Sequence, residues 1–143
     1  MIRTIVIAMI WRGDEFLVGE FEDLNGNGYF YRPLGGGVEF GEPAADALRR
    51  EVAEELNSDI ADIQYLTTLE NIFTYAGRQG HQIVLLYQCR LLNEAMYARE
   101  RVEYDDNGVS LYAVWKPLSF FDNGGPPLYP DGLLEFLHER NKG

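Results

Sequence analysis

Residues 35–58 read GGGVEFGEPAADALRREVAEELNS, a glycine run followed by a segment with helical periodicity. At about 100° per residue, the predicted helix over 44–56 has an apolar stripe next to an acidic stripe. The apolar stripe consists of Ala45, Leu48, Val52 and Leu56. The acidic stripe consists of Glu51, Glu54 and Glu55. We expect the first stripe to pack against a core, which leaves the second beside it for chemistry.

The acidic stripe requires a cation. Three carboxylates within about a turn and a half repel one another, and residues 42–55 hold five acidic residues against two arginines. All-oxygen ligands favour hard ions, so Mg²⁺ or Mn²⁺ is expected before Zn²⁺. The glycines at 35–37 have no Cβ, which lets a backbone turn approach a metal or a phosphate closely. Together the two features favour metal-assisted phosphoryl chemistry with a water nucleophile.

The spacing of these residues strongly resembles the Nudix box. The box consists of Gly, five residues, Glu, seven residues, Arg-Glu, an aliphatic residue, any residue, Glu-Glu, any residue, Gly and an aliphatic residue. Gly36, Glu42 and the run Arg50-Glu51-Val52-Ala53-Glu54-Glu55 fit seven of its nine defined positions. The resemblance implies a Nudix hydrolase, and predicted strands on both sides of the box extend it over most of the chain.

The resemblance also implies roles for the matched residues. A metal would be bound by Glu51, Glu54, Glu55 and the carbonyl oxygen of Gly36. Glu51 is alternatively the general base that activates water. Arg50 would take part in catalysis by fixing the helix face through an ion pair with Glu42. Water would then attack a phosphorus of a pyrophosphate linkage.

Two positions depart from the box. Asn57 stands where the family has Gly, and Ser58 stands where it has an aliphatic residue. The glycine would lie just past the helix C-terminus in the left-handed conformation, and Asn is the next most tolerant residue there. We therefore expect Asn57 to preserve the turn, and Ser58 to lose an apolar contact but no ligand.

Residues outside the box are expected to complete the site. Family members often take a further acidic residue from a later loop, and Glu103 is our choice. The other candidates are Glu70, Glu100, Asp105 and Asp106.

Arg32 and Tyr31 lead into the glycine run, a suitable place for phosphate contact and base stacking. Alternation along a strand puts Tyr29 and Tyr31 on one face and Arg32 on the other, so only one set can face the site. Tyr75 lies about where dinucleoside-polyphosphate members tend to carry a tyrosine.

The predicted function is Mg²⁺-dependent cleavage of a pyrophosphate linkage in a nucleoside triphosphate, a dinucleoside polyphosphate or a nucleotide sugar. Tyr75 gives a slight preference for dinucleoside polyphosphates. The alternative is a Nudix-like module that holds a nucleotide, or regulates, without cleaving it, although binding alone does not require all three glutamates. A third interpretation is a non-Nudix calcium or magnesium scaffold, with cation-dependent stability and no nucleotide affinity.

The rest of the chain predicts strands on both sides of the helix. Apolar, β-branched or aromatic runs occur at 4–10, 16–18, 29–34, 63–69, 72–75, 82–92 and 110–115. Asp131 could cap a short closing helix that carries Leu133, Leu134 and Leu137. This order predicts an α/β (α+β) fold, an α/β/α sandwich with a mixed β-sheet. No linker is long enough to separate two domains, so residues 1–143 are expected to form a single domain.

Composition limits the partners. The chain has 12 basic and 23 acidic residues, a net charge of −11. That charge repels a phosphate backbone and anionic lipid, so neither duplex nucleic acid nor a membrane is expected as a partner. Divalent cations can still hold a small nucleotide or polyphosphate.

The single Cys89 has no disulfide partner, which predicts a buried thiol and a reducing, cytoplasmic location. The sequence leaves open a monomer or a homodimer.

Overall fold

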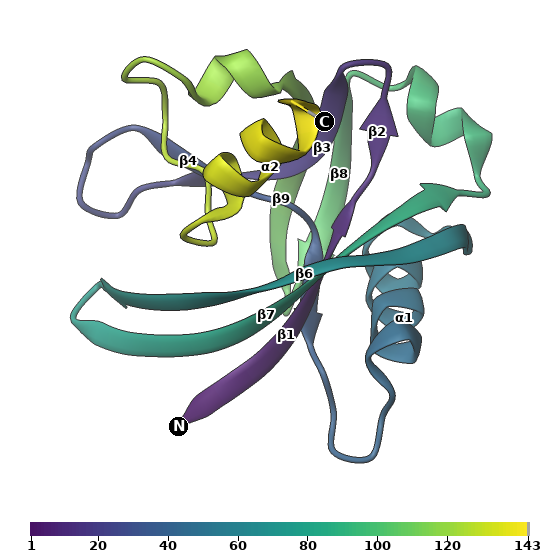
Figure 1. Cartoon of the computed structure of the whole chain (residues 1–143), viewed down its shortest axis with the longest axis horizontal. Helices are drawn as coiled ribbons and strands as arrows, with labels where there is room; N and C mark the ends of the chain where they lie inside the picture. The colour runs from purple at the N-terminus through teal and green to yellow at the C-terminus, as the bar shows by residue number, and fades with distance from the viewer. Residues whose placement is uncertain (143) are drawn as a thin grey trace.

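The computed structural model describes residues 1–142, in which β-strands alternate with two α-helices and two short 3₁₀ helices (Figure 1). In chain order the elements are β1 (Ile2–Met9), β2 (Trp11–Arg12), β3 (Glu15–Glu22), β4 (Tyr29–Arg32), β5 (Gly35–Gly37), α1 (Ala44–Leu56), β6 (Ile60–Tyr75), β7 (Arg78–Leu91), η1 (Glu94–Ala98), β8 (Arg101–Asp106), β9 (Val109–Pro117), η2 (Leu118–Phe121) and α2 (Leu133–Lys142). The bounds of α1 are those predicted for the helix that follows the glycine run.

The strands form two sheets. The first has the order β5-β1-β7-β6 and is mixed, because β1 pairs in parallel with β7 while its other pairings are antiparallel. The second has the order β2-β3-β9-β8, with β4 added along β3, and all its pairings are antiparallel. The predicted α+β fold with a mixed sheet is confirmed, and the second sheet is a feature that the sequence reading did not separate.

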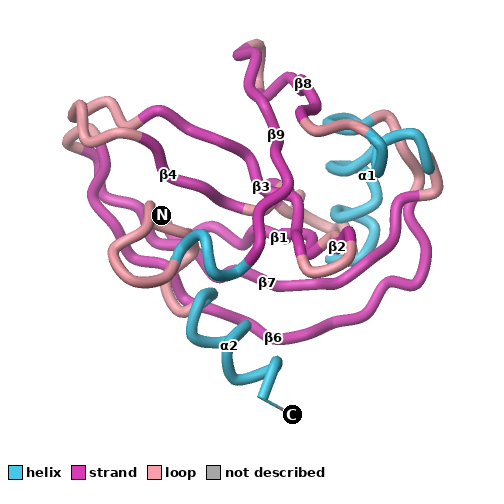
Figure 2. The backbone as a smooth tube through the Cα atoms, turned by 90° about the horizontal axis from the view of Figure 1, so that it is seen from above, coloured by secondary structure: helices cyan, strands magenta, loops and turns pink. Residues whose placement is uncertain are grey.

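The two α-helices cover opposite faces of the sheets, which gives the predicted α/β/α sandwich (Figure 2). Along β1, Val6 and Ala8 lie in the core on the α1 side, while Ile5 and Ile7 lie in the core on the α2 side. Burying an aliphatic side chain contributes about 1.5–3 kcal/mol, so β1 stabilises both layers at once. Cys89 is 6% exposed, as predicted for a buried thiol. No helix within residues 1–142 is long and apolar enough to cross a membrane.

Helix α1 packs through an apolar stripe close to the predicted one. The buried apolar residues of this stripe are Ala47, Leu48, Val52 and Leu56. The helix ends at Asn57, which is left-handed with φ 50° and ψ 48°, and whose N–H donates to the carbonyl oxygen of Ala53. The turn expected of Asn57 is therefore confirmed.

Ser58 has a polar role that the sequence did not predict. Its side chain is buried, and its hydroxyl accepts a hydrogen bond from the N–H of Asn93 at 3.0 Å. The same hydroxyl donates to the carbonyl oxygen of Asp59 at 2.8 Å. Ser58 thus ties the helix exit to the segment after β7.

Three local predictions were wrong. The glycine run is strand β5, paired with β1, and not a turn; a Cβ on Gly35 would collide with the carbonyl oxygen of Val6. The two strands predicted at 63–69 and 72–75 are one strand, because Glu70 and Asn71 keep their register with β7. Helix α2 begins at Leu133, so Asp131 lies ahead of its first turn, and its N–H donates to the side chain of Asn71 at 3.0 Å.

The left-handed conformation of Asn57 predicts how stability changes when this residue is replaced by the glycine that the Nudix box has at this position. Asn57→Gly removes the Cβ that disfavours this conformation, so the free energy of unfolding should stay the same or rise by up to about 1 kcal/mol. Asn57→Ala should lower it by about 1 kcal/mol, since Ala tolerates the conformation less well. Urea unfolding measures both changes. A marked loss of stability in Asn57→Gly would show that the Asn57 side chain has another role.

Candidate active site

The acidic face of α1 lies directly against the glycine strand. A Cβ on Gly36 would lie 2.5 Å from the carboxyl carbon of Glu51, so any side chain at position 36 would displace that carboxylate. The sheet explains the proximity, because β5 pairs with β1, whose residues Val6 and Ala8 share a core with α1. The fold thus brings bare backbone to the carboxylates of the Nudix box.

Arg50 holds this arrangement in place. Its guanidinium donates to both carboxylate oxygens of Glu42 at 2.9 Å each, to Glu51 Oε1 at 3.0 Å and to the carbonyl oxygen of Gly37 at 3.0 Å. The hydrogen bonds from Arg50 lower the pKa of Glu42 to about 2. In return, chiefly through Glu42, the pKa of Arg50 is raised. The structure contains the predicted ion pair, and it makes Arg50 a residue that positions Glu51.

Two of the three box glutamates are largely buried carboxyl groups. Glu55 is 9% exposed, and its Oε1 has no hydrogen-bond partner within the described residues. Burial, followed by repulsion from Glu51, raises the pKa of Glu55 to about 8. Burial also raises the pKa of Glu51, although Arg50 opposes this effect. A cation beside these carboxylates would favour their charged forms and give the Glu55 oxygen a partner.

The donor set fits a hydrated, hard cation better than a closed metal cage. Within residues 1–142, no group of three Asp, Glu, His or Cys side chains is placed to hold an ion by itself. Glu54 is exposed and directed toward Arg50, with 3.6 Å between Oε1 and Nη1. Mg²⁺ commonly keeps several waters and takes only one or two protein carboxylates besides the phosphates of a substrate. The unpartnered oxygen of Glu55 and the bare backbone at Gly36 suit such an ion.

Gly36, Glu51 and Glu54 line a polar cleft of about 500 Å³, whose lining does not include the buried Glu55. It is bordered by the β5 glycines, by the acidic face of α1, and by residues from β1, β4, β7 and the end of β8. The polar side chains contributed by the strands and by the turn after β8 are Arg3, Arg32, Gln82, Asp105, Asp106 and Asn107. The cleft therefore gathers both acidic and basic side chains around bare backbone.

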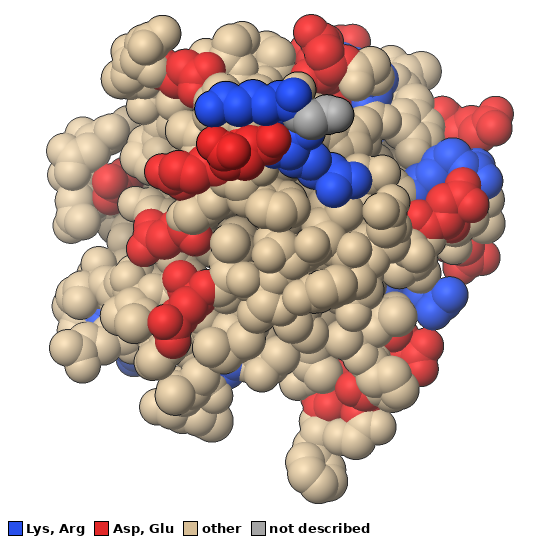
Figure 3. Space-filling view, viewed as in Figure 1, with Lys and Arg blue, Asp and Glu red and all other residues tan. Residues whose placement is uncertain are grey.

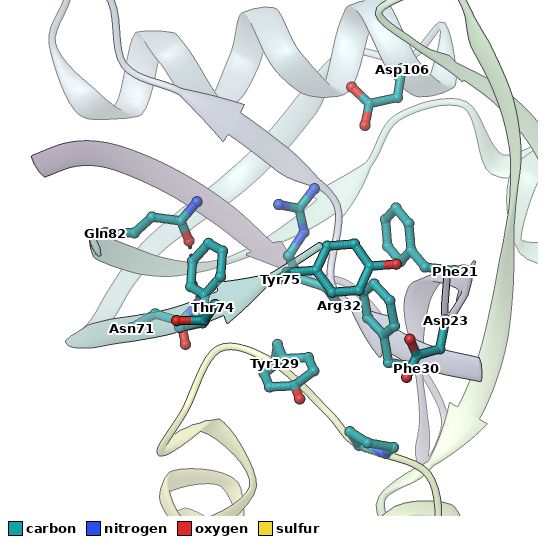
Figure 4. Close-up of a pocket in the computed structure, with 12 residues that line it drawn as sticks. Phe21, Asp23, Phe30, Arg32, Asn71, Thr74, Tyr75, Gln82, Asp106 and Tyr129 are labelled. Carbon is teal, nitrogen blue, oxygen red and sulfur yellow. Dashed lines mark hydrogen bonds between the residues drawn. The ribbon is translucent and has the colours of Figure 1, made fainter. Parts of the chain in front are cut away.

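A second pocket of about 280 Å³ lies beside the cleft and is mainly aromatic (Figure 4). Its rings belong to Phe21, Phe30, Phe73, Tyr75 and Tyr129. Phe30 makes edge contacts with Tyr75 and Tyr129, with ring centroids 5.6 and 5.7 Å apart. Three residues line both the pocket and the cleft: Arg32, Gln82 and Asp106. The two spaces adjoin, so a single ligand can occupy both.

Of the predicted substrate contacts, Arg32 and Tyr75 line the aromatic pocket and Tyr31 does not. Tyr31 is 4% exposed, packs against Phe121 in the core on the α2 side, and donates its hydroxyl to Glu20 at 2.8 Å. The reason is the alternation along β4, which gives Arg32 and Tyr31 opposite faces. Tyr31 therefore lies away from both the cleft and the pocket, whereas Arg32 is placed to meet a ligand.

Strand β8 brings Asp105 and Asp106 to the cleft, and Glu103, the residue chosen from the sequence, lines neither the cleft nor the pocket. Val102 and Tyr104 are buried on the α1 side, and alternation places Asp106 with them. Glu103 occupies the opposite face of the strand and is exposed. Asp106 lies close enough to Glu51 and Glu55 for its negative charge to contribute to the raised pKa of both.

The other acidic candidates are distributed differently. Asp105 lines the cleft. Glu70 is hydrogen-bonded to His81 at 2.8 Å, and Glu100 is paired with Arg12 at 3.3 Å. Neither of these two glutamates lines the cleft or the pocket.

Sequence reasoning missed several residues of the site. Arg3 and Gln82 face each other in the parallel pairing of β1 with β7, which joins distant segments and leaves no local pattern. Phe21 and Phe30 face each other across the β3–β4 hairpin, with stacked rings 5.2 Å apart. The aromatic residues on both sides of that glycine-rich turn were a signal that could have revealed this part of the pocket.

The sequence of the chain was compared with known protein families and with individual proteins. The family model described as "NUDIX domain" matches residues 1–119. Nucleoside triphosphatase NudI of Salmonella agona (strain SL483) is 36% identical over 132 residues, which cover 84% of this chain and 87% of the relative. Both matches include the whole of the box and the strands around it.

Two solved structures share the fold. A NUDIX hydrolase from Nitrosomonas europaea has a TM-score of 0.68 at 17% identity, covering 100% of this chain and 90% of that chain. The MutT NUDIX hydrolase from Burkholderia pseudomallei has a TM-score of 0.59 at 20% identity, covering 96% and 97%. The family match, the identity to the relative and the shared fold lead to one conclusion: the chain belongs to the Nudix family, whose members generally use divalent metal ions, and it is a Nudix-type pyrophosphohydrolase.

Proposed function

We propose that this enzyme hydrolyses a nucleoside triphosphate at a pyrophosphate linkage, with Mg²⁺ as its cofactor. The proposal rests on one observation: the aromatic pocket adjoins the polar cleft, and both are lined by Arg32, Gln82 and Asp106. A planar base can stack among the rings while the phosphates reach the carboxylates of α1. The combination is suited to a nucleotide and to neither a base nor a polyphosphate alone.

The choice of a triphosphate rests on the relatives and on Tyr75. The relative at 36% identity is named a nucleoside triphosphatase. Tyr75, which favoured dinucleoside polyphosphates in the sequence, accepts a hydrogen bond from the N–H of Leu24 at 3.0 Å. Its hydroxyl is thus engaged, and the ring is what Tyr75 offers to a substrate. Dinucleoside polyphosphates and nucleotide sugars become competitors in the test below.

The carboxylates of the box supply the place for Mg²⁺. We assign its binding to Glu51, Glu54, Glu55 and the carbonyl oxygen of Gly36, with Mn²⁺ as the expected substitute. The ion would neutralise charge on the phosphate oxygens when bound. The unpartnered oxygen of Glu55 and the approach of Glu51 to Gly36 support this assignment.

The residues of the chain orient the substrate and accept one proton. The water oxygen bonds to phosphorus, the bond from that phosphorus to the bridging oxygen breaks, and the leaving phosphate takes the electron pair. The proton of the water passes to a carboxylate, for which Glu51 and Asp106 are the candidates because both line the cleft. Arg50 orients Glu51 through a hydrogen bond of 3.0 Å. Arg32 adds positive charge where the pocket meets the cleft.

The charge distribution supports a small substrate. On the face shown in Figure 3, basic side chains lie in small separate groups among acidic ones, which is unlike the continuous basic surface that a duplex requires. A small polyphosphate can instead be held by the metal and by individual arginines. The cytoplasmic location and the choice between monomer and homodimer stay predictions.

A substrate panel tests the proposal. Nucleoside triphosphates, dinucleoside polyphosphates and nucleotide sugars are incubated with the enzyme and Mg²⁺, and the released phosphate, pyrophosphate and nucleotides are measured. We expect the highest kcat/KM for a nucleoside triphosphate. A higher value for either other class would overturn the choice of substrate. Tight nucleotide binding with no turnover of any compound would support a silent binding module.

The metal assignment predicts the effect of two substitutions in α1. Glu54→Gln and Glu55→Gln each replace a negative oxygen by a neutral amide of the same size. Each should lower Mg²⁺-dependent kcat/KM by about 100-fold or more, the order observed when a charge-stabilising group is lost, while the protein remains folded by circular dichroism. Glu139→Gln, at an exposed residue of α2, is the matched control and should keep full activity. Undiminished turnover in either α1 variant would contradict the assignment.

The alternation along β8 predicts opposite results for two neighbouring acidic residues. Asp106→Asn should lower kcat/KM by roughly 10- to 1,000-fold, because it removes either a general base or a charge beside the phosphates. Glu103→Gln should leave kcat/KM unchanged, since its side chain lies on the other face of the strand. Steady-state kinetics on both variants checks this. The reverse order of effects would show that the register of β8 is misassigned.

Burial of Glu55 predicts how the stability of the metal-free protein depends on pH. Its pKa is about 8 in the folded chain against an ordinary value of 4.5. Because the folded state holds the proton more tightly, this contribution to stability is complete below pH 4.5 and is lost as the pH rises through 8. In EDTA, the Tm of the wild type should therefore fall more steeply over this range than the Tm of Glu55→Gln.

The same experiment with Mg²⁺ provides the control. Binding a cation to the charged carboxylate should restore most stability at the alkaline end of the range, because it competes with the proton. Equal pH slopes for the wild type and Glu55→Gln would show that Glu55 does not titrate differently in the folded protein.

A further inference from the structure

Among the described residues, two arginines reach the cleft without a hydrogen-bonded or ion-paired side chain, although Arg32 lies over the ring of Phe21 at 5.6 Å and its charge opposes the raised pKa of Glu55. Within residues 1–142, Arg3 and Arg32 line the cleft and form no hydrogen bond or ion pair with other side chains. Arg50, the third arginine of the cleft, already donates to Glu42, Glu51 and Gly37. Any anion that enters the cleft therefore has Arg3 and Arg32 as its available cationic partners from the protein.

The position of Arg3 depends on a glycine. A Cβ on Gly37 would lie 2.6 Å from Nη2 of Arg3, so the guanidinium, at the end of a flexible side chain, lies over β5 in space that a larger residue would take from it. This places the positive charge of Arg3 beside bare backbone at the edge of the cleft. An arginine fork over exposed backbone is a suitable receptor for phosphate, which it can bind through two parallel hydrogen bonds.

Arg3 also begins a polar row that crosses the mixed sheet. Its register partner on β7 is Gln82, and the partner of Gln82 on β6 is Asn71. The side chain of Asn71 donates to Oε1 of Gln82 at 3.3 Å (Figure 4), and this hydrogen bond orients the amide of Gln82. The row leads from the cleft, where Arg3 lies, to the aromatic pocket, which Asn71 lines.

The positions of Arg32 and Arg3 along the aromatic pocket and the cleft indicate which phosphate of a bound nucleotide each arginine would contact. Arg32 lies where the pocket and the cleft meet, so it is placed for the phosphate next to the nucleoside. Arg3 lines the cleft and not the pocket, so it is placed for a phosphate farther from the base. We propose that Arg3 binds the terminal phosphate and makes the enzyme prefer nucleoside triphosphates to nucleoside diphosphates. This inference rests on the proposed function, because it uses the same site.

Charge explains why the contact would be selective. A terminal phosphate carries about −1.5 to −2 at neutral pH, and the cleft also holds Glu39, Asp105 and Asp106. Without Arg3, these carboxylates would repel the outermost phosphate. A diphosphate that is bound by its base and by Arg32 would be shorter by one phosphate and would gain little from Arg3.

Calorimetry with uncleavable analogues tests the inference apart from turnover. The probes are the α,β:β,γ-bis(methylene) triphosphate, in which both bridging oxygens are replaced by carbon, and the α,β-methylene diphosphate of the same nucleoside, titrated into the full chain with Mg²⁺. Arg3→Ala should weaken binding of the triphosphate analogue by about 10- to 100-fold, the range for a lost hydrogen-bonded charge. Its Kd for the diphosphate analogue should change by less than about threefold.

Three further variants separate a phosphate contact from a general effect. Arg3→Lys keeps the charge without the fork and should retain part of the preference. Gly37→Ala keeps Arg3 but pushes its guanidinium aside, so it should reduce the preference in the same direction. Arg90→Ala is the matched control, because Arg90 is an exposed arginine eight positions along β7 from Gln82, about 26 Å at the usual rise, and pairs with Asp62. It should leave both Kd values unchanged.

The possible results distinguish failure of the inference about Arg3 from failure of the proposed hydrolysis. If Arg3→Ala weakens both analogues equally, or weakens neither, Arg3 does not read the terminal phosphate. If wild-type enzyme cleaves triphosphates while that result is obtained, the proposed function stands and the inference about Arg3 falls. If wild-type enzyme cleaves no nucleotide but Arg3→Ala selectively loses the triphosphate analogue, the inference stands and the proposed hydrolysis falls. If the wild type binds neither analogue, both fall.

Discussion

The site depends on the fork of hydrogen bonds that Arg50 makes. One guanidinium reaches the loop before α1 through Glu42, the helix itself through Glu51 and the glycine strand through the carbonyl oxygen of Gly37. Glu42 extends the link by accepting from the backbone N–H of Glu39 at 3.1 Å. A planar group with several fixed donors can satisfy three segments at once, which the single ammonium of lysine cannot do in the same geometry. The box spacing is therefore the spacing that lets these three segments meet.

The hydrogen bonds of Arg50 do not reach Glu55, so the negative charge of this carboxylate is not balanced by them. An arrangement that lowers stability can here favour the binding of a cation. Arg50 orients Glu51, but Glu55 lies deeper, with one oxygen unpartnered among the described residues. A buried carboxyl group without a partner lowers the stability of a fold unless it is protonated or meets a cation. In the proposed function, the same placement makes Glu55 a ligand for a divalent ion that arrives with a polyphosphate. On that proposal, local instability in the empty protein is the counterpart of affinity in the loaded one.

The sequence predicted those features whose causes are local. The bounds of α1, the pair of Arg50 with Glu42 and the left-handed Asn57 all depend on residues within the box, and each is present. Glu103 and Tyr31 do not line the cleft or the pocket, because alternation puts them on the other face of β8 and β4, and the local sequence does not say which face of a strand meets the site. Arg3 was missed for a related reason, since nothing near residue 3 indicates a parallel neighbour at position 82.

The glutamates of the box and the aromatic pocket belong to different parts of the chain. The box glutamates occupy a single helix, whereas the rings come from β3, β4, β6 and the segment that holds Tyr129. Ring positions on the strand surface can drift during evolution without disturbing the helix, because they share no hydrogen bonds with the Arg50 fork. Descendants of one ancestral catalyst could in this way acquire new nucleobase preferences by exchanging a few aromatic side chains, with the phosphate chemistry inherited intact.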